Sequence, residues 1–335
     1  MSCVIVERGG PSVSLQDAGR PGKLGIGLSP GGAADRRGYL EALALLGLPF
    51  RGAVIEFAGL GGRLRFEAPT RFSLAGASMR ALLDGEPVEC QASHLAPPGA
   101  TLDIAAITKG VYGYLAFGGG IAVEPEFGGR GYHRIGGFGE PLGTGERLPL
   151  AEDMDLAAAP MRLPRDTASG PIRVMPGPQT GQFSPDMIET FSTTRFIRST
   201  RANRQGVGLD HDGNPFSTGE QLNLVSDFIT LGDIQMTGDG TPYVLLADCQ
   251  TIGGYPRIGT VLPVDLPRIA QAMAGDQLEF RFVTLDEAED AWTSDEALLA
   301  DLMAARTPRI RNPREMADLL SYSLVDRPGV EVLGD

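Results

Sequence analysis

Glycine is the residue type that most restricts what this chain can fold into. The 335-residue sequence contains 46 Gly and 25 Pro, and both favour tight turns over long regular elements. Asp84-Gly85 and Asp239-Gly240 lie between apolar segments and have the composition of hairpin turns. The clearest strand-like runs are Ala53–Phe57, Arg63–Glu67, Arg71–Leu74, Tyr112–Phe117, Ile172–Met175, Thr194–Arg198 and Tyr243–Ala247. The pattern predicts a mainly β protein with many short strands.

Three segments have helical periodicity instead. Apolar residues recur at helical spacing from Asp35 to Leu46, and Gly47 follows as a natural C-terminal stop. Leu266–Met273 is the second segment. Asp286–Ala305 is the third, and its acidic start and basic end suit the helix dipole. We therefore expect few helices, with the last one in a C-terminal appendage.

The Pro-rich stretch at residues 157–171 is the best candidate for a domain boundary. An internal similarity also indicates two related halves. A strand that ends in Asp17 is followed by glycines, a helix and another strand, and the strand that ends in Asp248 begins a similar series. We interpret this as one supersecondary unit used twice, although turn chemistry alone would produce part of the match.

Charge and composition exclude several functions. The formal net charge of −13 disfavours nucleic-acid binding, because phosphates need Lys and Arg opposite them. Met1–Gly10 does not read as a signal peptide, and Gly110–Val123 is too short for a membrane span. The three Cys are odd in number and widely spaced, and the three His lack paired metal spacing. These features predict a cytoplasmic protein with no nucleic-acid or membrane partner and no metal site of its own.

Three familiar motifs are also rejected. Gly27–Gly31 fits the G-x-S-x-G nucleophile elbow, but the residue after the Ser is Pro30, which has no N–H for an oxyanion. Lys23 follows a Gly as in a phosphate-binding loop, but Leu24 stands where Ser or Thr is required. The only other lysine is Lys109, and neither lysine follows Met. We therefore expect no biotin attached to this chain.

Glycine-rich segments with isolated polar residues follow strong strand signals at residues 14–35, 114–137 and 247–256. Loops at strand ends expose backbone N–H groups and position polar side chains for binding. The alternative is that these glycines only permit tight barrel corners.

Within and beside these segments, several motifs occur in a fixed order. They are Gln16–Gly22 (QDAGRPG), Gly32–Asp35 (GAAD), Glu56, Leu74–Ala77 (LAGA), Tyr114–Gly120 (YLAFGGG), Gly232–Gln235 (GDIQ) and Asp248–Pro256 (DCQTIGGYP). Together they resemble the urea amidolyase-related family, also called allophanate hydrolase subunit 2, which includes the C subunit of 5-oxoprolinase and biotin-dependent carboxyltransferase family proteins. The resemblance runs from Val13 to Phe282. Two positions depart from it: Gly208 replaces an Arg, and Phe127–Tyr132 differs from the usual loop.

The resemblance implies two cyclophilin-like β-barrel domains, with a few short helices and a C-terminal helical appendage. We predict the first barrel at residues 1–165, the second at 166–284 and the helical extension at 285–335. It also implies a partner similar to the B subunit of 5-oxoprolinase, with or without one similar to its A subunit. Such complexes open 5-oxoproline to glutamate with ATP. Carboxyl transfer from carboxybiotin to urea or another amide, and inhibition of a kinase by binding, remain alternatives.

The implied substrate is a small amide, and the implied cofactor is ATP, with Mg²⁺. A lactam is a poor electrophile, so ATP is expected to phosphorylate its oxygen before hydrolysis. That step needs cations and N–H donors around the developing phosphate charge. For each Arg the alternative is a structural ion pair, and for each Asp a loop cap. The predicted catalytic residues are Asp17, Arg20 and Asp248. The predicted substrate-binding residues are Gln16, Asp35, Arg204, Gln235, Gln250, Thr251 and Tyr255. The predicted nucleotide-binding residues are Gly118, Gly119, Gly120, Gly253, Gly254 and Arg257.

Overall fold

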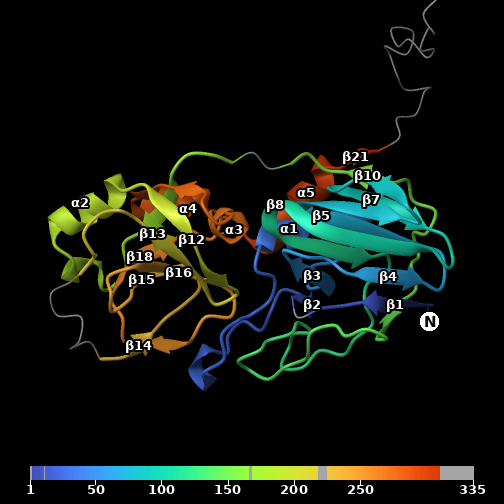
Figure 1. The fold of residues 1–335 in the computed structure, drawn as a ribbon, viewed down its shortest axis with the longest axis horizontal. Helices are drawn as coiled ribbons and strands as arrows, with labels where there is room; N and C mark the ends of the chain where they lie inside the picture. Colours follow the sequence, from blue (N-terminus) through green and yellow to red (C-terminus); the bar gives the residue numbers. More distant parts are fainter. Residues whose placement is uncertain (1, 11, 166–167, 218–224, 310–335) are drawn as a thin grey trace, which may run out of the picture.

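Two β-sheets stand side by side along the long axis of the molecule, with α1, α3 and α5 between them (Figure 1). The structure is a computed structural model that describes residues 2–10, 12–165, 168–217 and 225–309. Strands dominate and the helices are short. The fold class predicted from the sequence is therefore confirmed.

The first sheet has 11 strands, and its main path runs β21-β10-β7-β5-β8-β4-β1-β9. β8 pairs antiparallel with β3, β4 and β5, so this one long strand curves through the sheet and gives it a barrel-like form. The strands are β1 (Ser2–Arg8), β2 (Val13–Gln16), β3 (Val54–Ala58), β4 (Arg63–Phe66), β5 (Thr70–Leu83), β6 (Glu86–Val88), β7 (Ala92–Ala96), β8 (Thr101–Phe117), β9 (Arg147–Leu150), β10 (Met161–Arg162) and β21 (Thr307–Pro308).

The second sheet has eight strands in the order β19-β12-β13-β16-β15-β18-β11-β20. Its two edge strands are separated in sequence by Glu279 alone, so the chain brings both edges together and the sheet curls on itself. β14 (Asp227–Phe228) and β17 (Ile252–Gly253) form a separate ribbon. The strands are β11 (Ile172–Met175), β12 (Phe196–Asn203), β13 (Gly206–Asp210), β15 (Asp233–Met236), β16 (Pro242–Leu245), β18 (Arg257–Val261), β19 (Gln277–Leu278) and β20 (Phe280–Phe282).

The helices follow the expected capping chemistry. In α1 (Arg36–Leu46), the Asp35 side chain accepts a hydrogen bond from the Gly38 amide, and Gly47 ends the helix at φ 72°. α3 (Leu266–Gln271) also lies where it was predicted. α2 (Pro185–Thr193) was not predicted, although Ser184 and the Pro after it are a recognisable start. The short 3-10 turns are η1 (Leu24–Ile26) and η2 (Thr180–Gln182).

The single helix predicted at Asp286–Ala305 is wrong in detail, because the chain forms two helices there. α4 (Leu285–Ala291) ends at Trp292, and the Ser294 side chain caps the start of α5 (Asp295–Ala305) by accepting from the Ala297 amide. The Ser294 hydroxyl accepts from a backbone amide, and a Ser that does so is favoured at the start of a helix over its interior.

The described part of the C-terminal extension is joined to the first sheet. β21 pairs with β10, and an Arg306 guanidinium N–H donates to the Ala44 carbonyl of α1 at 2.9 Å. An ion pair between Arg36 and Asp295 also links α1 to α5. Residues 310–335 of the predicted extension lie outside the described residues, and the three domain boundaries remain predictions.

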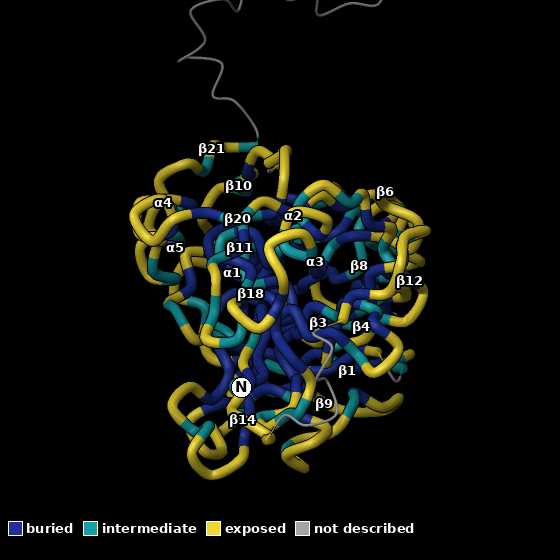
Figure 2. Tube along the Cα trace, turned by 90° about the vertical axis from the view of Figure 1, so that its left-hand side faces the viewer, coloured by how far each residue is buried: buried dark blue, intermediate teal, exposed yellow. Residues whose placement is uncertain are grey.

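α1 connects the two halves through a shared apolar core. Tyr39 and Leu43 of α1 are fully buried and belong to the same cluster as Phe191 and Ile234 of the second half. A second cluster lies within the first sheet alone. Figure 2, which looks along the long axis, shows buried positions in the interior and exposed positions around the outside. Fully burying one such side chain contributes about 1.5–3 kcal/mol, so the shared cluster strongly favours the paired arrangement.

The longest described helices, α1 and α5, each have 11 residues. Among the helices that the structure describes, none combines the length and apolarity required to span a membrane.

Replacing Gly76 by Ala should destabilise the protein more than replacing Gly85 by Ala. Both glycines have positive φ, 77° and 90°, but a Cβ at Gly76 would lie 2.7 Å from the Tyr112 carbonyl oxygen, whereas the space around Gly85 is open. We expect a loss of about 1–2 kcal/mol for Gly85→Ala from backbone strain, and a larger loss for Gly76→Ala. Urea unfolding monitored by circular dichroism would measure both, and equal losses would contradict the steric argument.

Candidate functional site

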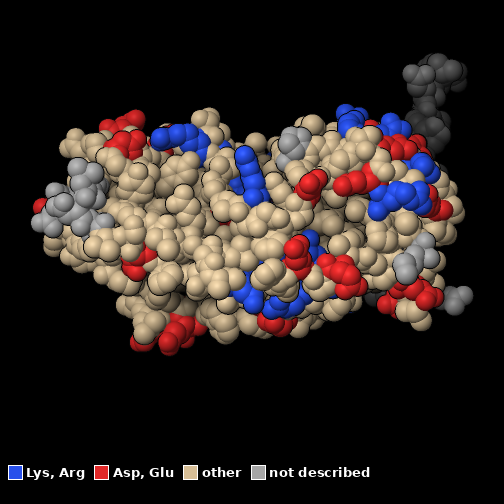
Figure 3. Space-filling view, turned by 90° about the horizontal axis from the view of Figure 1, so that it is seen from below, with Lys and Arg blue, Asp and Glu red and all other residues tan. Residues whose placement is uncertain are grey.

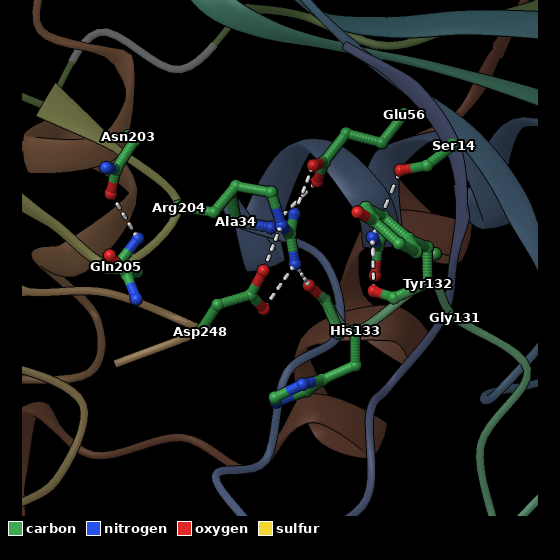
Figure 4. Close-up of polar contacts among 12 residues, drawn as sticks. Ser14, Ala34, Glu56, Gly131, Tyr132, His133, Asn203, Arg204, Gln205 and Asp248 are labelled. Carbon is green, nitrogen blue, oxygen red and sulfur yellow. Dashed lines mark hydrogen bonds and ion pairs between the residues drawn. The ribbon is translucent and has the colours of Figure 1, made fainter. Parts of the chain in front are cut away.

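A buried ion-pair network joins the two halves around Arg204. This residue lies in the tight turn between β12 and β13, and its guanidinium donates two hydrogen bonds to Asp248, at 2.8 and 2.9 Å. The same group donates to the Gly32 carbonyl at 2.6 Å and pairs with Glu56. Figure 4 shows the guanidinium between the two carboxylates. One cation of the second half is thus held by two acidic side chains and one carbonyl.

Glu56 extends the network into the first half. Its other carboxylate oxygen accepts from the Ala34 amide and from the Tyr114 hydroxyl, both at 2.8 Å. The Tyr114 oxygen in turn accepts from the Asp35 amide at 2.8 Å. We call the connected set of Arg204, Asp248, Glu56, Tyr114, Asp35 and Gln271 the Arg204 network.

Gln271 completes this network from α3 of the second half. Its side-chain amide donates to Asp35 at 2.6 Å and to the Tyr112 carbonyl at 2.8 Å. Its oxygen accepts from the Val111 amide at 2.7 Å and the Tyr112 amide at 3.1 Å. All four partners belong to the first half, so this single glutamine fixes α3 against β8.

Burial sets the electrostatics of these groups. The pKa of Asp35 is raised to about 6, chiefly by burial and to a smaller extent by the nearby Glu56 charge, while the hydrogen bond from Gln271 opposes the shift. Burial alone would lower the pKa of Arg204, but the charges of Glu56 and Asp248 outweigh it and raise the pKa above its ordinary value. Arg204 therefore stays charged, whereas Asp35 titrates near neutrality.

Asp17, Arg20 and Gln16 hold the glycine-rich loop at residues 126–138. The Arg20 guanidinium donates to the carbonyls of Glu126, Gly129 and Gly131 at 2.9–3.2 Å and lies 4.5 Å from the Phe138 ring centroid. Asp17 accepts from the Gly19 and Arg130 amides, and Gln16 donates to the Tyr132 carbonyl. These are the contacts of loop-positioning residues, and the catalytic roles of Asp17 and Arg20 remain predictions.

Ser29 and His133 form a buried pair beside this loop. Their Oγ and Nε2 atoms are 3.0 Å apart, and the Gly136 amide donates to His133 Nδ1 at 2.9 Å. Because Nδ1 accepts, the ring proton lies on Nε2 and points at Ser29, which is the wrong tautomer for a general base. Burial also lowers the pKa of His133. The pair therefore serves packing, in agreement with the rejected nucleophile elbow.

The segment after Asp248 is exposed. Gln250 and Tyr255 lie on the surface, and Thr251 is partly covered. Gln235 is buried beneath them, and a Cβ at Gly253 would lie 2.7 Å from its amide nitrogen. That nitrogen is buried and has no hydrogen-bond partner among the described residues. This loop brings together five of the predicted substrate-binding and nucleotide-binding residues, namely Gln250, Thr251, Gly253, Gly254 and Tyr255.

The Arg257 side chain makes ion pairs and hydrogen bonds within the second half. Its guanidinium pairs with Asp227 and Asp233 and donates to the Phe228 carbonyl at 2.6 Å, which fixes β14 to β15 and β18. Gly254 lies near it in sequence and is partly exposed.

Gly118, Gly119 and Gly120 directly follow β8 of the first sheet and pack against residues 151–153. A Cβ at Gly118 would lie 2.0 Å from an Asp153 carboxylate oxygen, and one at Gly119 would lie 2.3 Å from the Ala151 carbonyl oxygen. Gly120 exchanges hydrogen bonds with the backbone of Phe117 and Ala151. The nucleotide-binding roles of Gly118, Gly119, Gly120, Gly253, Gly254 and Arg257 remain predictions.

The described residues also contain no group of three His, Cys, Asp or Glu side chains placed to hold a metal ion. Asp17, Asp35 and Asp248, which were predicted as site residues, each accept hydrogen bonds from protein groups.

The two departures from the family pattern have structural consequences. At Gly208 a side chain would meet the Tyr243 ring at 2.9 Å, so Tyr243 fills the space where an Arg would stand. In the variant loop, a Cβ at Gly129 would lie 2.9 Å from Arg20, and one at Gly131 would lie 2.7 Å from the Gln16 oxygen. These glycines let the loop pack directly on the two side chains.

Several residues of the Arg204 network were not among the predicted site residues. Glu56 carries a signal, because it is a single carboxylate in the apolar strand sequence VIEF. Charged groups are rarely buried unless they are paired. Tyr114 and Gln271 carry no comparable signal, since their partners come from distant segments.

The chain matches the family described as "Carboxyltransferase domain, subdomain A and B" over residues 26–282 and belongs to that family. It is 30% identical over 283 residues to the 5-oxoprolinase C subunit of Haemophilus influenzae, covering 82% of this chain and 89% of that protein. It is 29% identical over 324 residues to a putative urea carboxylase of Emericella nidulans, covering 90% of this chain but 26% of that longer protein.

Solved structures agree with this family. The crystal structure of TTHA0988 superposes with a TM-score of 0.73 at 29% identity, and the match covers 85% of this chain and 56% of that one. The Kluyveromyces lactis urea amidolyase superposes with a TM-score of 0.80 at 23% identity, covering 93% of this chain and 21% of that one. The latter likeness concerns the fold alone.

Replacing Arg204 by Met should cost roughly 3–5 kcal/mol of unfolding free energy, because two buried carboxylates would lose their shared cation. Arg201→Met is the matched control, since Arg201 lies on β12 just before the turn that holds Arg204. Its side chain is 53% exposed, and its ion-pair partners are 50% and 63% exposed. Its loss should stay within about 1 kcal/mol. Urea unfolding measures both, and similar losses would show that the network contributes little.

Asp35 should make stability fall as pH rises. Its pKa is raised from 3.8 to about 6 in the folded state, so the folded protein binds more protons than the unfolded chain between these values. The stabilisation is complete below about pH 4 and is lost as pH rises towards 6. Asp35→Asn should flatten this fall in urea-unfolding free energy measured across that range. An unchanged slope would mean that Asp35 is ionised throughout.

Proposed function

We propose that this chain is the C-type component of an ATP-dependent enzyme that opens 5-oxoproline to glutamate, working with a partner of the B type. The similarity to a C subunit of 5-oxoprolinase carries the proposal, because it extends over 82% of this chain and 89% of the relative. A match along nearly the whole length of both proteins supports an equivalent part in a complex. A similarity limited to one shared motif would not.

An exposed apolar surface supports the need for a partner. The turn η1, the loop at residues 126–138 and the ribbon of β14 and β17 lie along the lower edge of Figure 1. These segments carry large hydrophobic side chains that are at least half exposed, namely Ile26, Phe127, Ile135, Phe228 and Ile252. Figure 3 views that edge face on, and uncharged atoms cover most of it. We call these five residues the lower apolar surface. Exposed apolar side chains gathered on one face are typical of protein-binding sites.

In this proposal the partner covers that face and the exposed Gln250–Tyr255 loop beside Asp248. Covering the loop removes water, which strengthens hydrogen bonds from Gln250, Thr251 and the backbone to a small amide. The Arg204 network holds Asp248 rigid at the start of this loop, so the polar groups are positioned before the substrate arrives. ATP would supply the activation of the lactam carbonyl, and we assign its binding to the assembled complex.

A second candidate function is carboxyl transfer from carboxybiotin to an amide such as urea. The similarity to a putative urea carboxylase, over 90% of this chain, favours it. This chain has no Met-Lys sequence, so another protein would supply the biotin.

Co-expression of the chain with its candidate partner proteins tests both functions. We expect glutamate release that depends on 5-oxoproline, ATP and every component of the complex, measured by coupled assay. Ile252→Asp should reduce co-elution with the partner by placing a charge in the apolar contact. Leu95→Asp is the matched control, because Leu95 on β7 is 51% exposed against 53% for Ile252 but lies outside the lower apolar surface.

Turnover of carboxybiotin with urea, and none of 5-oxoproline, would replace the first function by the second. Equal co-elution of the two Asp variants would contradict the assigned docking surface.

A further inference from the structure

A cavity of about 320 Å³ lies between the two halves. The first half contributes Asp35, Glu41, Gln91 and Lys109, and the second contributes Arg268 and Gln271. The volume is within the range of small-molecule sites in proteins. The cavity is lined by residues from α1, β8 and α3, none of which belongs to the lower apolar surface.

Gln91 is the first sign that the cavity has a ligand. This residue is 5% exposed and lines the cavity, and its side-chain oxygen is buried without a hydrogen-bond partner among the described residues. Its backbone also has φ 58°, a conformation that costs free energy for a residue other than Gly. A buried acceptor that lacks a donor is rare in folded proteins and is costly. A ligand N–H group would supply the missing donor.

Two buried carboxylates face the same space. Glu41 is 3% exposed and accepts from the Gln91 amide at 2.6 Å and from Arg37 at 3.1 Å. Asp35 is also 3% exposed and accepts from Gln271. Burial raises the pKa of Glu41 to about 7, as it raises that of Asp35. The inner wall is thus rich in acceptors that a hydrogen-bond donor would stabilise.

Four positively charged residues also line the cavity, namely Arg37, Lys109, Arg165 and Arg268, together with a third carboxylate, Asp276. Lys109 is exposed at the rim, and the described residues include no ion-pair partner for it. Arg268 lines the second half of the rim. An anionic group placed here would meet Lys109, while the rest of the ligand faced Gln91 and Glu41.

We propose that this cavity binds a small carboxylate that also bears an N–H group, the chemistry of an α-amino acid or its cyclic amide. The carboxylate is held by Lys109 at the rim, and the N–H group donates to the Gln91 side-chain oxygen. Asp35 belongs both to the cavity wall and to the Arg204 network, so the bound ligand contacts the structure that supports Asp248. The inference uses the proposed function only to choose a probe.

Isothermal titration of the full chain without partners tests this site with three matched probes. 5-Oxoproline has both a carboxylate and an N–H group, 2-pyrrolidinone lacks the carboxylate, and cyclopentanecarboxylate lacks the N–H. We expect 5-oxoproline to bind at least roughly ten-fold more tightly than either partial probe, since each lacks one charged or buried hydrogen bond. Inorganic phosphate should bind no better than the partial probes.

Lys109→Met should weaken 5-oxoproline binding by about ten-fold. Lys23→Met is the matched control, because Lys23 is the only other lysine and lies outside the cavity. Ser78→Leu, which places a larger side chain at the cavity wall, should also abolish binding while circular dichroism stays unchanged. Absent binding, equal affinity for all probes, or equal effects of the two Lys variants would overturn the site. Because no partner or ATP is present, that failure would leave turnover by the complex untouched.

Discussion

The ion pairs of Arg204 are the interaction on which the relation between the two halves depends. A guanidinium from the turn between β12 and β13 is held by Asp248 of its own half and by Glu56 of the other. Partly buried charges of opposite sign attract strongly only when their hydrogen bonds are satisfied, and here a carbonyl, an amide and a tyrosine hydroxyl complete the set. The network therefore fixes one orientation, while the apolar core supplies most of the attraction.

The same network reaches two separate parts of the molecule. At one end, Asp248 precedes the partly exposed loop at residues 250–255, which includes an apolar side chain that we assign to a partner contact. At the other end, Asp35 forms part of the cavity wall. The path from Asp248 to Asp35 consists of four contacts through Arg204, Glu56 and Tyr114. A ligand in the cavity and a partner on the loop would thus act on one connected structure.

Glycine plays a different part at different positions. At Gly85 it permits a hairpin turn with open space around it, whereas at Gly76 and Gly118 it makes room for a neighbouring backbone or carboxylate. The glycines at 129 and 131 let a loop pack on Arg20 and Gln16. Glycine-rich segments that were predicted to bind ligands therefore also contain glycines that allow neighbouring groups to pack closely.

The sequence by itself determined the mainly β class, the hairpins at Asp84 and Asp239 and the capped helix after Asp35, because turn chemistry, capping and periodicity are local properties. The family followed from the resemblance of its ordered motifs, and the family match over residues 26–282 agrees with it. The sequence also placed Asp248 and Arg204 among the predicted site residues. Only the tertiary structure decided that Arg204 joins Asp248 to Glu56, that Arg20 holds a loop, and that Gln91 lines a cavity with an unpaired oxygen. Arg204 and Glu56 are 148 positions apart in the sequence, and no local pattern records which distant side chain a folded chain brings near.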